Sequence, residues 1–131
     1  MRYLSPAWLD AAGEALADSP GLRSAITDLA LTLEQTVTGG PDGTVRWHVV
    51  LDHGDARLVR GPAERSDLRF STSYGVASAI ALGELATPMA FMAGELRVGG
   101  DLTLLTRHQR LLASLDDVLV DVRKATTFAA S

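Results

Sequence analysis

The spacing of apolar residues changes several times along the chain, and each change predicts a different element. Ser5-Pro6 combines a hydroxyl cap with a proline at the first helical position, which predicts a helix from there to about Asp18. Ser19-Pro20-Gly21 is predicted to end this helix. The apolar residues of the segment recur at helical spacing and are expected to share one face: Trp8, Leu9, Ala12, Ala15 and Leu16.

From Ile26 onward the apolar period falls to two, which predicts strands with one buried face. A turn cluster at 39–43 separates the first strand from a second at 45–52, and a tight turn at His53-Gly54-Asp55 leads into a third at 56–60. These three strands are predicted to form an antiparallel meander. The residues expected on the buried face of the first two strands are Leu29, Leu31, Leu33, Val37, Val45, Trp47, Val49 and Leu51.

The second half of the chain mixes short strands with helices. A fourth strand is predicted at about 68–71, followed by a helix that ends at Gly83 and a second, short helix over 89–92. A fifth strand over 95–98 is closed by Gly99-Gly100, and Asp101 is expected to cap one long amphipathic helix. These blocks predict an α+β fold, with one sheet and helices on one side of it.

Length and composition favour one domain with an aliphatic interior. The 131 residues suit a single domain over 1–131, with an N-terminal helix at about 5–18 and a core at about 24–123. Apolar residues make up 47% of the chain but aromatic residues only 5%, so the interior is either packed with small aliphatic side chains or lines a cavity. A net charge of −4 argues against nucleic acid as a partner and against a polybasic membrane anchor.

The absence of cysteine and the ends of the chain favour a cytoplasmic protein. Without cysteine there is neither a disulfide framework nor a thiolate, which fits a reducing compartment. Pro6 and Asp10 interrupt any apolar run of signal-peptide length, and the final three residues are not a peroxisomal signal. The stretch 70–94 has Glu84 as its only charge, but its Ser, Gly, Thr and Pro residues predict a buried helix-turn-helix in a soluble domain instead of a membrane span.

The residues that could carry catalytic chemistry do not occur in a catalytic pattern, so we predict that the protein is not an enzyme. The three histidines have no cysteine or carboxylate-histidine spacing that would make a metal site, and surface or hydrogen-bonded roles are expected for His48, His53 and His108. The carboxylates at 116, 117 and 121 are expected on a solvated helix face. We therefore predict no catalytic residue, no metal ligand and no cofactor. Arg57 and Arg69 are close enough in the expected sheet to form a small patch for anionic headgroups, but Glu64 and Asp67 intervene, so this patch is only an alternative to ordinary surface arginines.

The order of motifs in the centre of the chain resembles the sterol carrier protein type-2 family of lipid-binding domains. The most specific piece is Ala90–Asp101, which is similar to the family block Ala-Phe-Met-x-Gly-x-Leu-x-x-x-Gly-Asp. Trp47-x-Val49-x-Leu51 and the aspartate that opens the fourth strand match in order and spacing, and the resemblance covers about 29–112. It implies a five-stranded, mostly antiparallel sheet covered on one side by helices and enclosing an apolar tunnel for sterols, fatty acyl chains or similar lipids.

From this resemblance and the apolar pattern we expect a lipid-binding or lipid-transfer protein that needs no covalent chemistry and makes at most transient membrane contact. Tyr74 is the expected polar anchor. The alternatives are that these side chains are ordinary core, or that the domain is an interaction or accessory module with a filled cavity, for instance a homodimer. The residues expected to line the cavity are Trp47, Val49, Phe70, Tyr74, Ile80, Met89, Phe91, Met92, Leu105, Leu112 and Leu115.

Overall fold

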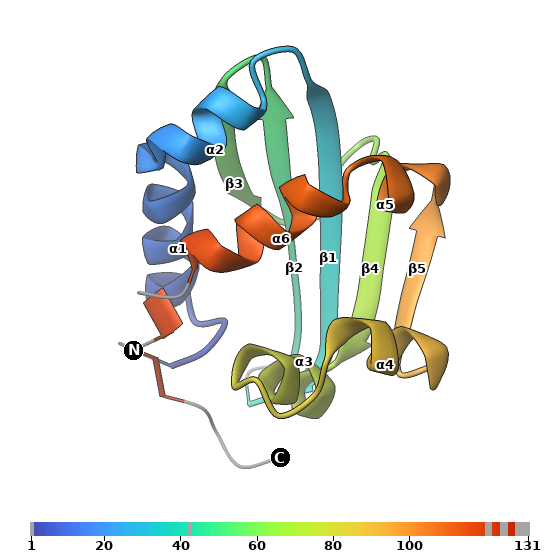
Figure 1. The fold of residues 1–131 in the computed structure, drawn as a ribbon. Coiled ribbons are helices and arrows are strands. Elements are labelled where there is room, and N and C mark those ends of the chain that lie inside the picture. Colours follow the sequence, from blue (N-terminus) through green and yellow to red (C-terminus); the bar gives the residue numbers. More distant parts are fainter. Residues whose placement is uncertain (1, 42, 120–121, 124–125, 128–131) are drawn as a thin grey trace.

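A five-stranded sheet forms the centre of the computed structural model, which describes residues 2–41, 43–119, 122–123 and 126–127 (Figure 1). The side chain of residue 116 is also outside the described part. The elements in chain order are α1 (Pro6–Asp18), α2 (Pro20–Ala25), β1 (Ala30–Gly40), β2 (Gly43–Asp52), β3 (Asp55–Arg60), β4 (Leu68–Ser73), α3 (Tyr74–Ala81), α4 (Thr87–Met92), β5 (Leu96–Gly100), α5 (Thr103–Arg107) and α6 (Gln109–Val118).

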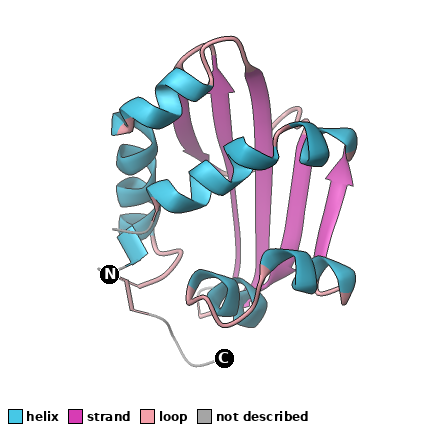
Figure 2. Ribbon diagram, in the orientation of Figure 1, coloured by secondary structure: helices cyan, strands magenta, loops and turns pink. Residues whose placement is uncertain are grey.

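The strand order is β3-β2-β1-β4-β5, so the predicted meander occupies one half of the sheet. β1–β2, β2–β3 and β4–β5 pair antiparallel, whereas β4 lies parallel to β1, with Leu68 opposite Leu33. Every described helix lies on one face of this sheet, which we call the inner face (Figure 2). The predicted α+β fold with a mostly antiparallel sheet covered on one side is confirmed.

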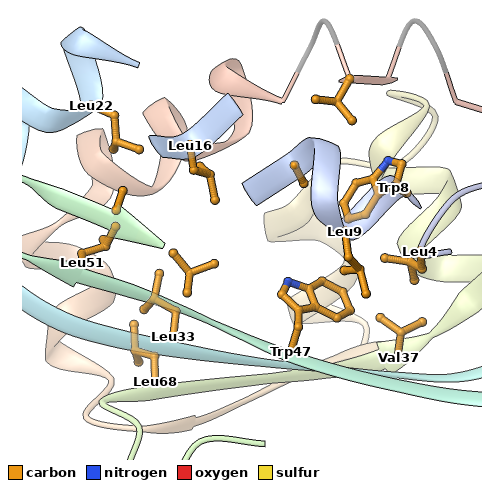
Figure 3. Close-up of a cluster of buried hydrophobic side chains, with 14 of the residues drawn as sticks. Leu4, Trp8, Leu9, Leu16, Leu22, Leu33, Val37, Trp47, Leu51 and Leu68 are labelled. Atoms are coloured by element: carbon orange, nitrogen blue, oxygen red, sulfur yellow. The ribbon is translucent and has the colours of Figure 1, made fainter. Parts of the chain in front are cut away.

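Strand alternation places the apolar side chains on the inner face, as the sequence predicts. Leu31, Leu33 and Val37 of β1 are buried, while Thr32, which alternates with them, faces the other side and is only half-buried. Figure 3 shows Leu33, Leu51 and Leu68 of the sheet meeting leucines of α1 and α2. The core is therefore densest where α1 and α2 cover the meander.

Aromatic side chains from the N-terminal segment complete this core. The Trp8 ring meets the Trp47 ring edge-on, with centroids 6.4 Å apart. Tyr3 lies between Trp8, at 5.0 Å, and Tyr74, at 5.8 Å. Trp8, Trp47 and Tyr74 are at most 8% exposed. Edge-to-face pairs of this kind add about 0.5–1.5 kcal/mol beyond the area that they bury, so the N-terminal segment is held firmly on the sheet.

One helical prediction is confirmed and another is wrong. α1 ends at Asp18, as predicted for Ser19-Pro20-Gly21, and the same residues also begin α2, which was not predicted: the Ser19 hydroxyl accepts a hydrogen bond from the Leu22 N–H and Pro20 is the first residue of the helix. The predicted long helix after Asp101 is broken at His108, whose φ of −116° and ψ of 31° are not helical. The break lets α5 lie over β4 while α6 turns across the sheet toward α1 (Figure 1). Packing against two separate surfaces thus overrides a continuous helical pattern.

The junction of β1, β4 and β5 is held by Asp67. Its carboxylate accepts the Thr32 N–H at 2.7 Å, and its carbonyl accepts the Asp101 N–H at 3.0 Å. The same carbonyl oxygen would lie 2.3 Å from a Cβ built on Gly100, which has φ of +97°. Gly100 is therefore required both by its backbone conformation and by the close approach of two chain segments.

Gly100→Val is expected to lower the free energy of unfolding by at least about 3 kcal/mol, because it adds left-handed strain to a clash with backbone atoms. Urea unfolding followed by circular dichroism measures this loss. Gly83→Val is the matched control, since Gly83 also has positive φ, +77°, but has no atom within 4 Å of a built Cβ. An equal loss in the two variants would contradict the role of the close approach.

Candidate apolar binding site

The inner face of the sheet is unevenly covered. Pairing across the strands places Trp47, Gln35, Phe70 and Val98 in one row. The rows on either side hold buried residues, among them Leu33 and Leu68 on one side and Val37 and Leu96 on the other. In the middle row Trp47 is buried, but Gln35, Phe70 and Val98 are only half-buried.

The half-buried positions lie where helical cover is thinnest. Among the described residues, helices stand at the two ends of β4 and β5, with α5 at one end and α3 and α4 at the other, and none crosses their middle (Figure 1). We call Phe70 and Val98 the inner strip. Two apolar side chains that face one another across two strands, with incomplete cover above them, are suited to contact an apolar ligand.

Helices α5 and α6 contribute half-buried apolar side chains to the helical layer on the inner face. Leu104 and Leu105 of α5 and Leu112 and Leu115 of α6 are half-buried and pack against the core. The start of α5 is fixed because Asp101 Oδ1 accepts hydrogen bonds from the Thr103 hydroxyl, at 2.6 Å, and from the Thr103 N–H, at 3.2 Å. These two bonds, the hydroxyl first, hold the pKa of the Asp101 carboxyl below its usual value.

Helix α4 presents apolar side chains to solvent. Met89, Phe91 and Met92 are 59%, 45% and 80% exposed, and Leu82 at the end of α3 is 51% exposed. Only Ala90 of α4 is buried. The prediction of a buried helix-turn-helix over 70–94 is therefore wrong for α4, because this six-residue helix has one inward position and turns its larger side chains outward. We call Leu82, Met89, Phe91 and Met92 the α4 patch.

The residues expected to line a cavity fall into three environments. Trp47, Val49 and Tyr74 belong to the packed core, and Met89, Phe91 and Met92 are exposed. The remaining five are half-buried: Phe70 on β4, Ile80 on α3, Leu105 on α5, and Leu112 and Leu115 on α6. They come from separate elements, with α3 and α5 at opposite ends of β4 (Figure 1), so the role of all eleven as a ligand wall stays a prediction.

Two open hollows among the described residues are lined largely by polar and charged side chains and lie away from the inner strip. One, of about 400 Å³, lies at the α5–α6 break beside Ala25 and is lined by Arg107, His108 and Arg110 among others. The other, of about 540 Å³, lies beside the loop that precedes β4 and includes Glu34, Glu64 and Arg65. Both mix polar and charged side chains, so neither has the lining expected of a lipid tunnel.

The histidines and carboxylates considered for metal binding or catalysis do not come together in the described residues. His48 Nδ1 donates to the Gly61 carbonyl at 2.9 Å and His53 Nδ1 to Asp52 at 2.6 Å, which confirms the hydrogen-bonded role expected for these histidines. In the described ranges, no group of three or more His, Asp or Glu residues is placed to hold a metal ion. Asp117 is exposed; residue 121 and the side chain of residue 116 lie outside the described part.

The alternative of an arginine patch at Arg57 and Arg69 is not assembled in the structure. Arg57 lies on β3 and Arg69 on β4, and the sheet order puts β2 and β1 between them. Three strand spacings, about 14 Å, and an offset of two residues along the strands separate them. Arg57 instead pairs with Asp55 at 3.3 Å. The prediction is wrong because it assumes that the third and fourth strands are neighbours, whereas β4 joins the sheet on the other side of β1.

Two residues that shape the candidate site are not predicted by the sequence patterns. Gln35 lies on the inner face although it interrupts an apolar series, and that interruption was the available signal. Tyr3 covers Tyr74, which therefore faces the N-terminal segment and not an open space. This contact joins residues far apart in the chain, and no local pattern indicates it. No helix in the described part of the chain is long and apolar enough to cross a membrane.

A family model and two solved structures match most of this chain. The model of the SCP-2 sterol transfer family matches residues 10–113. A search of curated proteins finds no match. A conserved hypothetical protein from Thermus thermophilus has a similar structure, with a TM-score of 0.72 and 24% identity over 93% of this chain and 90% of the other. A sterol carrier protein 2 crystal structure also has a TM-score of 0.72, with 23% identity over 91% of this chain and 98% of the other.

The same fold also occurs within a much larger enzyme. A sec-alkylsulfatase from Pseudomonas matches with a TM-score of 0.52 and 16% identity, over 79% of this chain but only 14% of the sulfatase. At these identities the likeness to each of the three structures concerns the fold alone. The sulfatase shows that a domain of this shape can be one part of a longer polypeptide.

Thr103→Val is expected to raise the pKa of Asp101 toward its ordinary value, because the variant removes the hydroxyl donor and keeps the N–H. A carboxyl whose pKa is lowered by folding stabilises the fold above its unfolded pKa, and this contribution is lost as the pH falls through the folded value. Carboxyl chemical shifts in an NMR titration give the pKa. Thr106→Val, an exposed substitution in the same helix, is the control; an unchanged Asp101 pKa in Thr103→Val would contradict the assignment.

Proposed function

This chain belongs to the SCP-2 sterol transfer family, and on that premise we propose that it binds a sterol, a fatty acyl chain or a similar lipid without covalent chemistry. The observation that carries the proposal is the half-buried inner strip. Phe70 and Val98 pair with one another on β4 and β5, and both are half-buried. We propose this region, with the half-buried members of the expected wall, as the lipid site. Its expected setting is the cytoplasm, as a single domain over residues 1–131.

The strip explains why an apolar ligand would be favourable there. Burying a phenylalanine or valine side chain completely is worth about 1.5–3 kcal/mol relative to leaving it in water, and the strip gains only part of that in the free protein. A lipid chain laid on Phe70 and Val98 would cover the remainder while burying its own methylenes. The site is thus suited to molecules whose affinity comes from apolar area.

We also propose that membrane contact is transient and uses the α4 patch. Between Glu84 and Glu95 the chain carries no charge, and the patch offers four apolar side chains. A stable protein interface buries about 20–30 residues a side, far more than this patch supplies. A few apolar side chains at the tip of a short helix instead suit shallow insertion between lipid headgroups. Such contact would bring the protein to a bilayer long enough to exchange a lipid.

A second candidate function is an interaction or accessory module. It is favoured by the aromatic packing at Trp47 and Tyr74, because Trp8 and Tyr3 occupy space that the predicted tunnel would use. The occurrence of the fold within the alkylsulfatase adds support. The candidate requires a partner, which for a homodimer is a second copy. Analytical ultracentrifugation tests this candidate. A mass that rises with protein concentration, together with no lipid binding, would favour the interaction module over the lipid carrier.

The lipid-binding proposal predicts that affinity rises with chain length. For saturated fatty acids and primary alcohols of about eight to eighteen carbons, each added methylene contributes up to about 0.8 kcal/mol, or about fourfold in Kd. Phe70→Ala is expected to weaken binding throughout the series. Val59→Ala, which removes an exposed apolar side chain from β3, serves as control and is expected to leave it unchanged.

Equilibrium binding gives the chain-length series, and native mass spectrometry of the protein purified from its expression host detects lipid that stays bound. A flat dependence in both the acid and the alcohol series, with no copurified lipid, would refute the proposal.

The α4 patch predicts a kinetic effect. Met89→Gln combined with Met92→Gln is expected to slow lipid transfer between donor and acceptor vesicles about tenfold, because the membrane-bound encounter becomes weaker. Vesicle cosedimentation and a fluorescence transfer assay measure the two quantities. Leu102→Gln is the matched control, since Leu102 is also apolar and 47% exposed but lies outside the patch. Equal transfer rates in the double variant and the control would argue against membrane contact through α4.

A further inference from the structure

One amide occupies a position on β1 that the strand's pattern reserves for apolar side chains. Leu31, Leu33 and Val37 alternate onto the inner face and are 4%, 2% and 4% exposed. Gln35 continues the same alternation, since residues two apart in a strand point to one side. No register irregularity intervenes before Val37. The Gln35 side chain therefore extends from the inner face and not into the solvent on the opposite side.

The register places this amide at the edge of the inner strip. Gln35 pairs with Trp47 on β2 and with Phe70 on β4, and Phe70 in turn pairs with Val98 on β5. Directly opposed side chains in a sheet have Cβ atoms about 4.5–5.5 Å apart. Gln35 thus lies between two aromatic side chains, one of them in the packed core and the other in the half-covered region.

The Gln35 amide has no hydrogen-bond partner among the described residues, although it is half-buried. A glutamine side chain can donate two hydrogen bonds and accept two. Its amide atoms are not among the buried polar atoms without a partner in the described residues, so water reaches them in the free protein. The amide is therefore available to an oxygen of a ligand that displaces this water from the surface that we assign to the lipid, whereas a leucine or valine would offer no such partner.

We propose that Gln35 is the polar anchor of the lipid site and hydrogen-bonds an uncharged oxygen of the ligand, a hydroxyl or an ester carbonyl. This inference rests on the proposed function and adds a ligand class to it. The amide both donates and accepts, so it matches a hydroxyl in either direction. It differs from the anchor expected from the sequence, Tyr74, which is 3% exposed and packs against Tyr3.

The surroundings favour an uncharged head group over a carboxylate. Trp47, Phe70 and Val98 carry no charge, and the fifth member of the row is Arg60 on β3, opposite Trp47. Arg60 is engaged with the Pro6 carbonyl and the Asp10 carboxylate, at the far side of Trp47 from Gln35. A carboxylate at Gln35 would lie in partly apolar surroundings, and the single cation of this row already has partners, so its burial is costly.

The test compares ligands of one chain length, carried in phosphatidylcholine vesicles at trace concentration: hexadecanol, hexadecanoate at about pH 8, where the acid is ionised, and hexadecane. We expect the unmodified protein to take up hexadecanol at least about tenfold more tightly than hexadecanoate. In Gln35→Leu the affinity for hexadecanol is expected to fall about tenfold while that for hexadecane is kept or rises. Thr36→Val, on the opposite face of β1, is the control and should change no ratio. Gln35→Met, which keeps the length of the side chain, repeats the measurement if Gln35→Leu does not fold.

The outcomes separate the two levels of the proposal. If all three ligands bind and the ratio of hexadecanol to hexadecane is the same in Gln35→Leu, Gln35 is not the anchor, although the lipid site stands. Tighter binding of hexadecanoate than of hexadecanol would refute the uncharged class. If the unmodified protein takes up none of the three, the lipid-binding function itself is refuted.

Discussion

An apolar sheet face has to be covered along its whole width, and in this fold the helices cover it unequally. α1 and α2 pack over the meander, where Leu33, Leu51 and Trp47 are buried. The other half of the sheet has helices only at the ends of its strands, as far as the described residues show (Figure 2). A sheet is stabilised by burying one face, so the partly exposed middle of β4 and β5 contributes less apolar burial to the stability of the fold. The candidate site, the exposed α4 and the role proposed for Gln35 all relate to this unequal cover.

The sequence predicts the strands and their faces well, because alternation is a local property. The positions expected inward on β1 and β2 are inward in the structure, from Leu31 to Leu51. Turn chemistry at His53-Gly54 is also local, and both residues have positive φ. The end of α1 at Ser19-Pro20 is also local and was predicted correctly, although the start of α2 at the same residues was not predicted. The single long helix predicted after Asp101 is wrong, because the break at His108 lacks the glycine or proline that would mark it.

The candidate site is less predictable than the fold for the same reason. The block Ala90–Asp101 correctly marks α4 and β5, but it does not say which of its side chains are enclosed. Met92 is exposed since α4 has a single inward position, whereas Gly100 and Asp101 serve the junction with Asp67. Trp47 and Tyr74 belong to the core because Trp8 and Tyr3 reach them from the other end of the chain. Their surroundings depend on contacts that no local motif encodes.

The parallel pairing of β1 with β4 has a consequence for how the chain folds. The meander β1-β2-β3 can form from neighbouring segments, but β4 must find β1 across a separation of 35 residues, as the bond from Thr32 to Asp67 shows. Closing so long a loop costs conformational entropy before any contact repays it. The meander is therefore expected to assemble early, and docking of β4 to limit the rate of folding. Until β4 docks, β1 presents an unpaired strand edge with apolar side chains. During this period the chain is most able to pair with another copy of itself.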